Sequence, residues 1–229
     1  MSSSSSAPSS IRKITRSFGG YTFSSDFDSG SLLDIKQTGP DSFDLWVACD
    51  NHGTPHERDA YRTWFYFSVL GAKMGHTLTC TIRNLNNKET LFRKGMECVM
   101  RSLPSQPQWL TMGSTAYTVL DLPPGSSEKK PTHMELSFQH TFTHVDVNER
   151  VEFAYTYPYS YDVLQQNLQE LDEKLAGNTE IYYHREMLVP SVTGKRIDLI
   201  TITSHEGICL SVSTYQTPLI CALLITLVT

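Results

Sequence analysis

The sequence predicts a mainly β protein, an antiparallel β-sandwich followed by the first helix and β-hairpin of an incomplete α/β domain. Apolar and polar residues alternate with a period of two in run after run between residues 20 and 158. Turn-forming sequences separate these runs, and no alternation of strands with helices accompanies them. A helical spacing of apolar residues appears only after residue 158. Short strands joined by turns are typical of an antiparallel sandwich.

The clearest strand is MELSFQHTFTH at 134–144, because every second residue is apolar or histidine. Its predicted buried face comprises Met134, Leu136, Phe138, His140, Phe142 and His144. Similar alternation runs through Phe43–Leu45–Val47, Leu78–Cys80–Ile82 and Val151–Phe153–Tyr155–Tyr157, with turns predicted at 38–42, 84–89, 122–127 and 147–150. The continuous aromatic stretch WFYFSV at 64–69 is compatible with a binding platform, but its continuity favours a strand buried on both faces.

The pattern changes after residue 158, where SYDVLQQNLQELDEKLAGN has helical spacing. Ser160 is placed as an N-cap, and Gly177 follows the predicted end of a helix over 161–175. The next stretch, IYYHREMLVPSVTGKRIDLITITSHEG, reads as two strands around a Ser-Val-Thr-Gly-Lys turn, a hairpin over 181–203. We therefore divide the chain into a Ser-rich disordered tail (1–19), a β-sandwich (20–158), the start of an α/β domain (159–207) and a divergent apolar tail (208–229).

Composition limits the classes of partner and compartment. The net charge of −5 without a basic block argues against nucleic acid. Five cysteines in no CxxC pair, and the absence of N-x-[ST] sequons, favour a reducing, cytoplasmic location. The Ser-rich start lacks the apolar segment of a secretory signal; a transit peptide and a solvated tail both fit it.

The apolar run at 219–228 is too short to span a membrane, so we expect no stable membrane insertion. Either this tail adds a strand to the hairpin, or it associates with other copies when exposed.

Two groups of histidines could in principle bind metal. The loop CDNHGTPHERD contains Cys49, Asp50, His52, His56, Glu57 and Asp59. Gly53 and Pro55 oppose a helix that would place His52 and His56 on one face, so a surface loop is the preferred interpretation. His140 and His144 share a strand face but are separated by ~13 Å of strand rise, so they are better explained as core or edge histidines.

Other catalytic signatures are missing from the sequence. It contains neither the G-x-S-x-G of a nucleophile elbow nor the spacing of a phosphate-binding loop, and VTGKR fits a hairpin turn. We therefore predict no catalytic, cofactor-binding or metal-binding residue.

Five stretches taken together resemble the cytosolic carboxypeptidases, zinc enzymes that trim glutamates from tubulin and related proteins. They are YTFSSDFDSGSL (21–32), RTWFYFSVLG (62–71), FRKGMECVMRSLP (92–104), FAYTYPYSYDVLQQNLQEL (153–171) and the hairpin sequence beginning at Ile181. The resemblance implies an N-terminal antiparallel β-sandwich followed by an α/β carboxypeptidase domain, with FAYTYPYSY marking the junction.

The resemblance also implies residues that this sequence lacks. In the family the His and Glu of a His-Pro-Gly-Glu sequence after the hairpin bind zinc. A later His is the third ligand, and a general-base Glu and substrate-binding Arg and Asn lie beyond it. Here SHEG is followed by ICLSVSTYQ, and the chain contains no His-x-x-Glu. We therefore expect a truncated N-terminal fragment, inactive by itself and without a zinc cofactor, whose partners through the family are tubulin or other glutamylated proteins. The alternative is a non-enzymatic binding or regulatory module that docks on tubulin or on the full-length enzyme.

Overall fold

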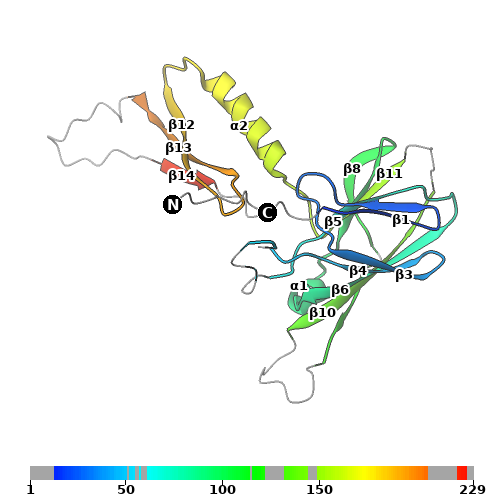
Figure 1. Cartoon of the computed structure of the whole chain (residues 1–229). Coiled ribbons are helices and arrows are strands. Elements are labelled where there is room, and N and C mark those ends of the chain that lie inside the picture. Colours follow the sequence, from blue (N-terminus) through cyan, green and yellow to red (C-terminus); the bar gives the residue numbers. More distant parts are fainter. Residues whose placement is uncertain are drawn as a thin grey trace, which may run out of the picture. The chain divides into compact units, whose positions relative to one another are not determined.

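The computed structural model describes residues 13–50, 52–54, 57, 61–113, 115–121, 132–143 and 149–205, together with the backbone of 221–225. Backbone contacts divide the chain into two compact units (Figure 1). The first is Ile11–Pro158, and the main part of the second begins at Tyr159.

The first unit contains a six-stranded sheet in which all neighbouring strands are antiparallel. Its order is β1 (Thr15–Phe18), β2 (Tyr21–Ser24), β5 (Tyr66–Leu70), β11 (Arg150–Ala154), β7 (Val99–Leu103) and β8 (Gln106–Thr111). Gly71, at the end of β5, has a φ of +82°, and a Cβ there would collide with the carbonyl oxygen of Gly20. A side chain at Gly71 would therefore strain the backbone and push the β1–β2 turn away from β5.

The second sheet of this unit has five strands, β3 (Asp34–Gly39), β4 (Ser42–Trp46), β6 (Thr77–Asn86), β10 (His133–Thr141) and β9 (Ala116–Val119), in that order. Its neighbours are antiparallel except for β4 and β6, which pair in parallel because the chain passes through β5 of the other sheet between them. A short helix, α1 (Glu89–Arg93), follows β6 where the sequence indicated only a turn, and it buries Phe92.

The core of the first unit is formed by the apolar side chains of both sheets. The predicted face of β10 is confirmed: Met134, Leu136, Phe138 and Phe142 are buried, and His140 is half-buried. All residues from Phe65 to Val69 are buried, as expected for a strand covered on both faces. Phe65, Phe67 and Val69 belong to this core, whereas Tyr66 packs in a separate cluster with Phe27, Trp64 and Trp109. The predicted mainly β fold class is therefore confirmed.

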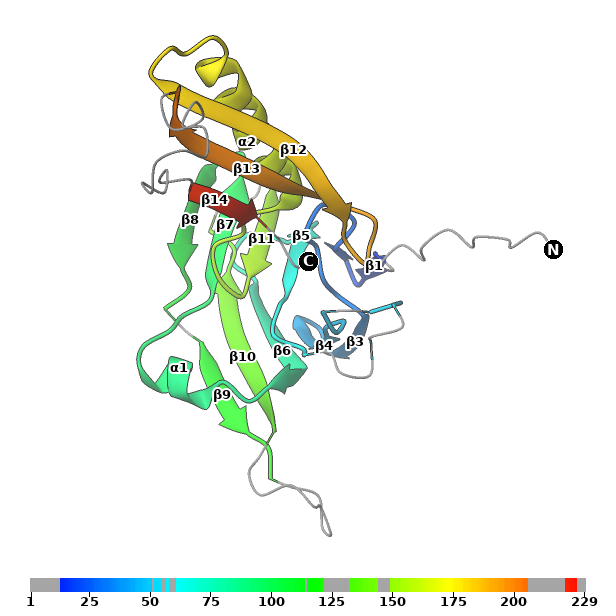
Figure 2. The ribbon, with the colours of Figure 1, turned by 90° about the vertical axis from the view of Figure 1, so that its left-hand side faces the viewer.

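The second unit comprises helix α2 (Tyr161–Leu175) and a three-stranded antiparallel sheet of β12 (Ile181–Pro190), β13 (Arg196–Ser204) and β14 (Cys221–Ile225). Figure 2 shows β13 between the other two strands. The Ser160 side chain accepts a hydrogen bond from the Val163 N–H, as predicted for an N-cap. Of the predicted apolar stripe of α2, Leu164 and Leu168 are buried, whereas Leu171 and Leu175 remain partly exposed.

The C-terminal tail contributes β14, which pairs with β13 and so follows the first of the two alternatives for this segment. The rest of 208–229 and residues 1–12 of the predicted tail lie outside the described residues. The predicted bound of that tail at residue 19 is wrong, because residues 15–18 form β1, which pairs with β2 in the sandwich. No helix in the described part of the chain is long and apolar enough to cross a membrane.

Candidate functional site

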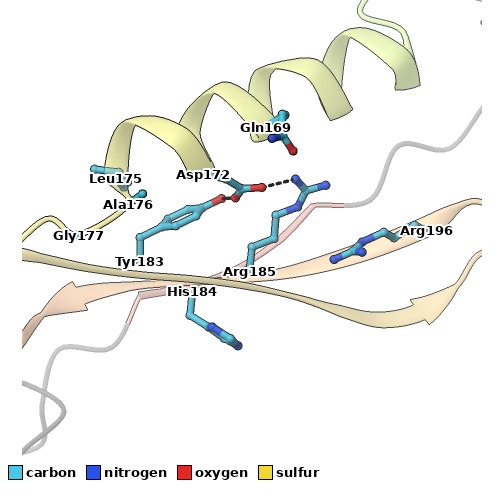
Figure 3. Close-up of a pocket in the computed structure, with 9 residues that line it drawn as sticks. All are labelled: Gln169, Asp172, Leu175, Ala176, Gly177, Tyr183, His184, Arg185 and Arg196. Atoms are coloured by element: carbon cyan, nitrogen blue, oxygen red, sulfur yellow. Dashed lines mark hydrogen bonds and ion pairs between the residues drawn. The ribbon is translucent and has the colours of Figure 1, made fainter.

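A polar hollow of about 460 Å³ lies in the second unit, beside α2 and the β12–β13 hairpin (Figure 3). Its lining residues are Gln169, Asp172, Leu175, Ala176, Gly177, Tyr183, His184, Arg185 and Arg196. Tyr183 and Arg185 point toward α2 in Figure 3, whereas His184 points to the opposite face of the sheet. This follows from the strand, whose successive side chains alternate between faces.

Arg185 is the centre of this hollow, and its charge is balanced by carboxylates. Its Nη1 lies 2.9 Å from Asp172 Oδ2, and its Nη2 lies 3.0 Å from Asp198 Oδ2. Asp198 is 2% exposed and also pairs with Arg196, while Asp172 accepts a hydrogen bond of 2.8 Å from the Tyr183 hydroxyl. These ion pairs and hydrogen bonds form one continuous network that joins the hairpin to the helix.

The ionisation of this network gives no sign of acid–base chemistry near neutral pH. Burial, together with the hydrogen bond to Asp172, raises the pKa of Tyr183 to about 12. Burial alone would raise the pKa of Asp198, but hydrogen bonds from Arg185, Arg196 and Gln165 outweigh it and hold the pKa below its usual value. Tyr183 therefore stays protonated and Asp198 stays charged near neutral pH, and both take part in the network that joins the hairpin to the helix.

A second buried carboxylate, Glu152, lies on the face of the six-stranded sheet away from the main core. The Tyr66 hydroxyl donates to it at 2.7 Å, and Arg101 and Arg150 lie 2.8 and 2.6 Å from its oxygens. The Arg101 guanidinium also stacks over the Trp109 ring at 4.6 Å. Glu152 is thus fully neutralised by its neighbours, which indicates a role in holding β5, β7 and β11 together.

The loop after β4 brings together three of the six residues considered as metal ligands in the sequence. Ligand atoms of Cys49, His52 and Glu57 all lie within 4.8 Å of one another. Asp50 is described but does not join this group, and His56 and Asp59 lie outside the described residues. Although Gly53 opposes a helix here, turns of the chain gather these three side chains instead.

Of the two strand histidines, His140 has the core surroundings that its position on the strand predicted. The His140 ring lies 4.8 Å from that of Phe142 and 5.6 Å from that of Phe153. Burial lowers the pKa of His140, which keeps the ring neutral near pH 7. His144 lies outside the described residues.

The described residues do not fit the catalytic zinc site that the family resemblance implies. Across the parts of the chain that the structure describes, one group of three or more possible ligands was found, and it contains a cysteine, a histidine and a glutamate from a loop of the sandwich. The site implied by the resemblance requires His and Glu three residues apart together with a further His. No hydrolytic step can therefore be assigned to these residues.

Comparison with known families identifies the class of protein. Residues 23–156 match the model of the cytosolic carboxypeptidase N-terminal domain. This match covers more than half of the chain, so the protein belongs to the cytosolic carboxypeptidase family.

Individual relatives extend this similarity beyond the sandwich. The chain is 34% identical over 222 residues to cytosolic carboxypeptidase-like protein 5 of Mus musculus, a match that covers 83% of this chain and 24% of the relative. It is 31% identical over 205 residues to cytosolic carboxypeptidase 1 of Homo sapiens, covering 82% and 16% of the two chains. The chain thus matches about a quarter or less of the length of these relatives.

Solved structures show the same fold. A putative carboxypeptidase A from Shewanella denitrificans superposes with a TM-score of 0.51 and 21% identity, covering 81% of this chain and 40% of that one. A putative carboxypeptidase from Burkholderia mallei gives a TM-score of 0.53 and 20% identity, covering 80% and 39%. The match therefore includes both the sandwich and elements that follow it.

Proposed function

We propose that these 229 residues form the N-terminal region of a cytoplasmic zinc carboxypeptidase that removes glutamates from tubulin and other proteins, and that this region is not a peptidase by itself. The observation that carries the proposal is the family match over residues 23–156, combined with 34% identity to a cytosolic carboxypeptidase-like protein. In the proposed role the sandwich is a folded domain placed before the catalytic one, and α2 with the hairpin begins the catalytic domain.

The chemistry of the residues supports the second half of the proposal. A zinc carboxypeptidase needs a metal to polarise the scissile carbonyl and activate water, and a carboxylate to accept the proton from that water. The sequence has no His-x-x-Glu. Among the described residues, the buried carboxylates Glu152 and Asp198 are each neutralised by arginines, so neither is poised as a general base. A third buried carboxylate, Glu149, accepts a hydrogen bond from the Ser105 hydroxyl.

The test is an assay for glutamate release. The purified chain is incubated with a polyglutamylated peptide and zinc, with a whole cytosolic carboxypeptidase as positive control. We expect no release above the buffer background. Release by the purified chain that a chelator abolishes would overturn the proposal.

A second candidate function is a binding or regulatory module that docks on tubulin or on the full-length enzyme. The observation that favours it is the closed core of the first unit, in which both sheets bury their facing aromatic side chains. Cosedimentation with glutamylated and unmodified microtubules tests it. Saturable binding that depends on glutamylation would support docking on tubulin, whereas equal and unsaturable pelleting with both would count against it.

A further inference from the structure

The Cys49–His52–Glu57 group is fixed at its base by the sandwich. The Asn84 side chain of β6 makes two hydrogen bonds of 2.9 Å with the backbone of Val47, one to its N–H and one to its carbonyl oxygen. The Asp50 N–H donates to the Tyr61 carbonyl oxygen at 2.8 Å, which closes the other side of the loop. Cys49, between these two anchors, is 6% exposed. Its thiol therefore has a position set by the fold.

Short turns bring the other two side chains to this cysteine. The His52 N–H donates to the Cys49 carbonyl oxygen at 3.0 Å, and the Glu57 N–H donates to the Thr54 carbonyl oxygen at 3.2 Å. His52 Nδ1 lies 2.9 Å from Glu57 Oε1, and the Gly53 N–H donates to Glu57 Oε2 at 3.1 Å. Backbone hydrogen bonds and the carboxylate thus hold one imidazole and one carboxylate beside one thiol.

The separations suit a tetrahedral ion. Zinc bonds of ~2.3 Å to sulfur, ~2.0–2.1 Å to nitrogen and ~2.0–2.2 Å to oxygen place tetrahedral ligand atoms about 3.4–3.6 Å apart. The three ligand atoms lie within 4.8 Å of one another. Small side-chain rotations would complete the geometry, and a fourth position would remain for water.

We propose that Cys49, His52 and Glu57 form a zinc-binding site in the loop between β4 and β5. Mixed sulfur, nitrogen and oxygen ligands favour zinc over magnesium or calcium, which prefer oxygen alone. Binding converts the Cys49 thiol to a thiolate and releases its proton to solvent, and His52 binds as neutral imidazole. The two negative ligands then balance the charge of the ion.

The competing explanation is that the His52–Glu57 hydrogen bond only locks the loop. In that explanation the Cys49 thiol is one more hydrogen-bond partner of Glu57, so a signal that depends on a metal–sulfur bond separates the two. Cobalt(II) supplies it, because a cobalt–thiolate bond gives a charge-transfer band in the near ultraviolet. The experiment uses the full chain carrying Cys209→Ser and Cys221→Ser, which removes two thiols outside this group.

Cobalt is titrated into this protein after removal of metals, and zinc is then added in competition. We expect a thiolate band that saturates at one cobalt per chain, is displaced by zinc, and is abolished by Cys49→Ser. His52→Gln and Glu57→Gln should each weaken zinc binding at least ~10-fold, since even changes next to metal ligands have effects of that size. The matched control is His76→Gln, because His76 pairs with Asp41 at 3.2 Å outside the Cys49 group and its loss should leave the titration unchanged.

A second measurement does not depend on the stability of the variants. X-ray absorption of the zinc-loaded parent protein should show one sulfur at ~2.3 Å and the remaining ligands as nitrogen or oxygen. No cobalt–thiolate band in the parent protein, the same band in Cys49→Ser, or a zinc shell without sulfur would each overturn the proposal.

Discussion

The two units of this protein are stabilised in different ways. The first packs a continuous core between two sheets, in which Phe23, Phe67, Phe138 and Phe153 are all at most 1% exposed. Among the described residues of the second unit, the buried apolar side chains are Leu164, Leu168 and Ile200, with Tyr183 packed beside them. Beside this cluster, Asp198 and Arg185 form ion pairs that link the strands to α2. The first unit is held mainly by apolar burial, whereas the second combines a small apolar cluster, a three-stranded sheet and an ion-pair network.

This difference matters because the two kinds of interaction contribute unequally. A fully buried large apolar side chain contributes ~1.5–3 kcal/mol to folding. A buried ion pair loses most of its Coulombic gain to desolvation, yet it becomes costly when one partner is removed. The second unit also leaves apolar side chains of β12 exposed, namely Met187, Leu188 and Val189. We therefore expect the sandwich to fold independently and the second unit to be the weaker of the two.

The largest expected difference between the two units is in how fast a protease cleaves them. A protease of broad specificity should cut between about Ser160 and Gly194 and leave a resistant core that ends near Pro158, because cleavage follows local opening. Mass spectrometry of the fragments over time provides the measurement. Cleavage that spares the last third of the chain while degrading the sandwich would contradict the comparison.

Phe67→Ala tests the core of the sandwich. Phe67 is 0% exposed, and its ring lies 5.5–6.4 Å from those of Phe23, Phe65, Phe138 and Phe153. Removal of this ring should lower the free energy of unfolding by ~3–5 kcal/mol, through lost burial and a cavity. Urea unfolding followed by tryptophan fluorescence measures the loss. The exposed Leu110→Ala is the control, and an equal effect of the two changes would show that the core is not close-packed.

Asp198→Asn tests the ion-pair network of the second unit. The amide keeps the shape of the carboxylate but removes the charge that faces Arg185 and Arg196, so we expect a loss of ~1.5–3 kcal/mol confined to this unit. Hydrogen exchange measured peptide by peptide should be faster than in the parent protein in β12 and β13. The exchange rates of β5 and β11 should not change. Asp172→Asn should destabilise this unit much less, because the Asp172 side chain is 34% exposed. Equal losses for the two variants would mean that burial does not determine the loss of stability.

The network also gives the second unit a defined response to acid. The pKa of Asp198 is held below its usual value of 3.8 in the folded protein. A group with a depressed pKa contributes stability that is complete above the unfolded value of ~3.9 and is lost as the pH falls through the folded value. The protection factors of β12 and β13, which correct for the intrinsic pH dependence of amide exchange, should therefore fall below about pH 4 in the parent protein and much less so in Asp198→Asn.

The smallest expected effect is at the cap of α2. Ser160→Ala removes the hydrogen bond to the Val163 N–H and should destabilise the second unit by ~1 kcal/mol. Ser160→Gly should destabilise it by only a few tenths of a kcal/mol, since glycine leaves the N–H accessible to water. Thermal unfolding followed by circular dichroism at the helix band compares the two. No difference between them would mean that the cap does not limit the stability of α2.

The sequence by itself determined the elements whose signal is local. The two-residue alternation at Met134–Leu136–Phe138 placed a strand with one buried face, because the pleat sends alternate side chains to opposite sides. Ser160 and Gly177 marked the ends of α2 because capping depends on a few neighbouring residues. The hairpin around Gly194, which has a φ of +79°, could also be predicted, because a tight turn depends on a few neighbouring residues.

Contacts between distant residues were decided only by the tertiary structure. The parallel pairing of β4 with β6 depends on where β5 lies in the other sheet, which no local pattern records. Asp198 meets Arg185 across the hairpin and Gln165 from the helix, and its burial follows from that meeting. Cys49, His52 and Glu57 converge through short local turns, whereas the position of this loop on the sandwich depends on Asn84, which binds the Val47 backbone from another strand. Spacing along the chain gives the reach of a side chain, whereas its neighbours in space depend on how the whole sheet is assembled.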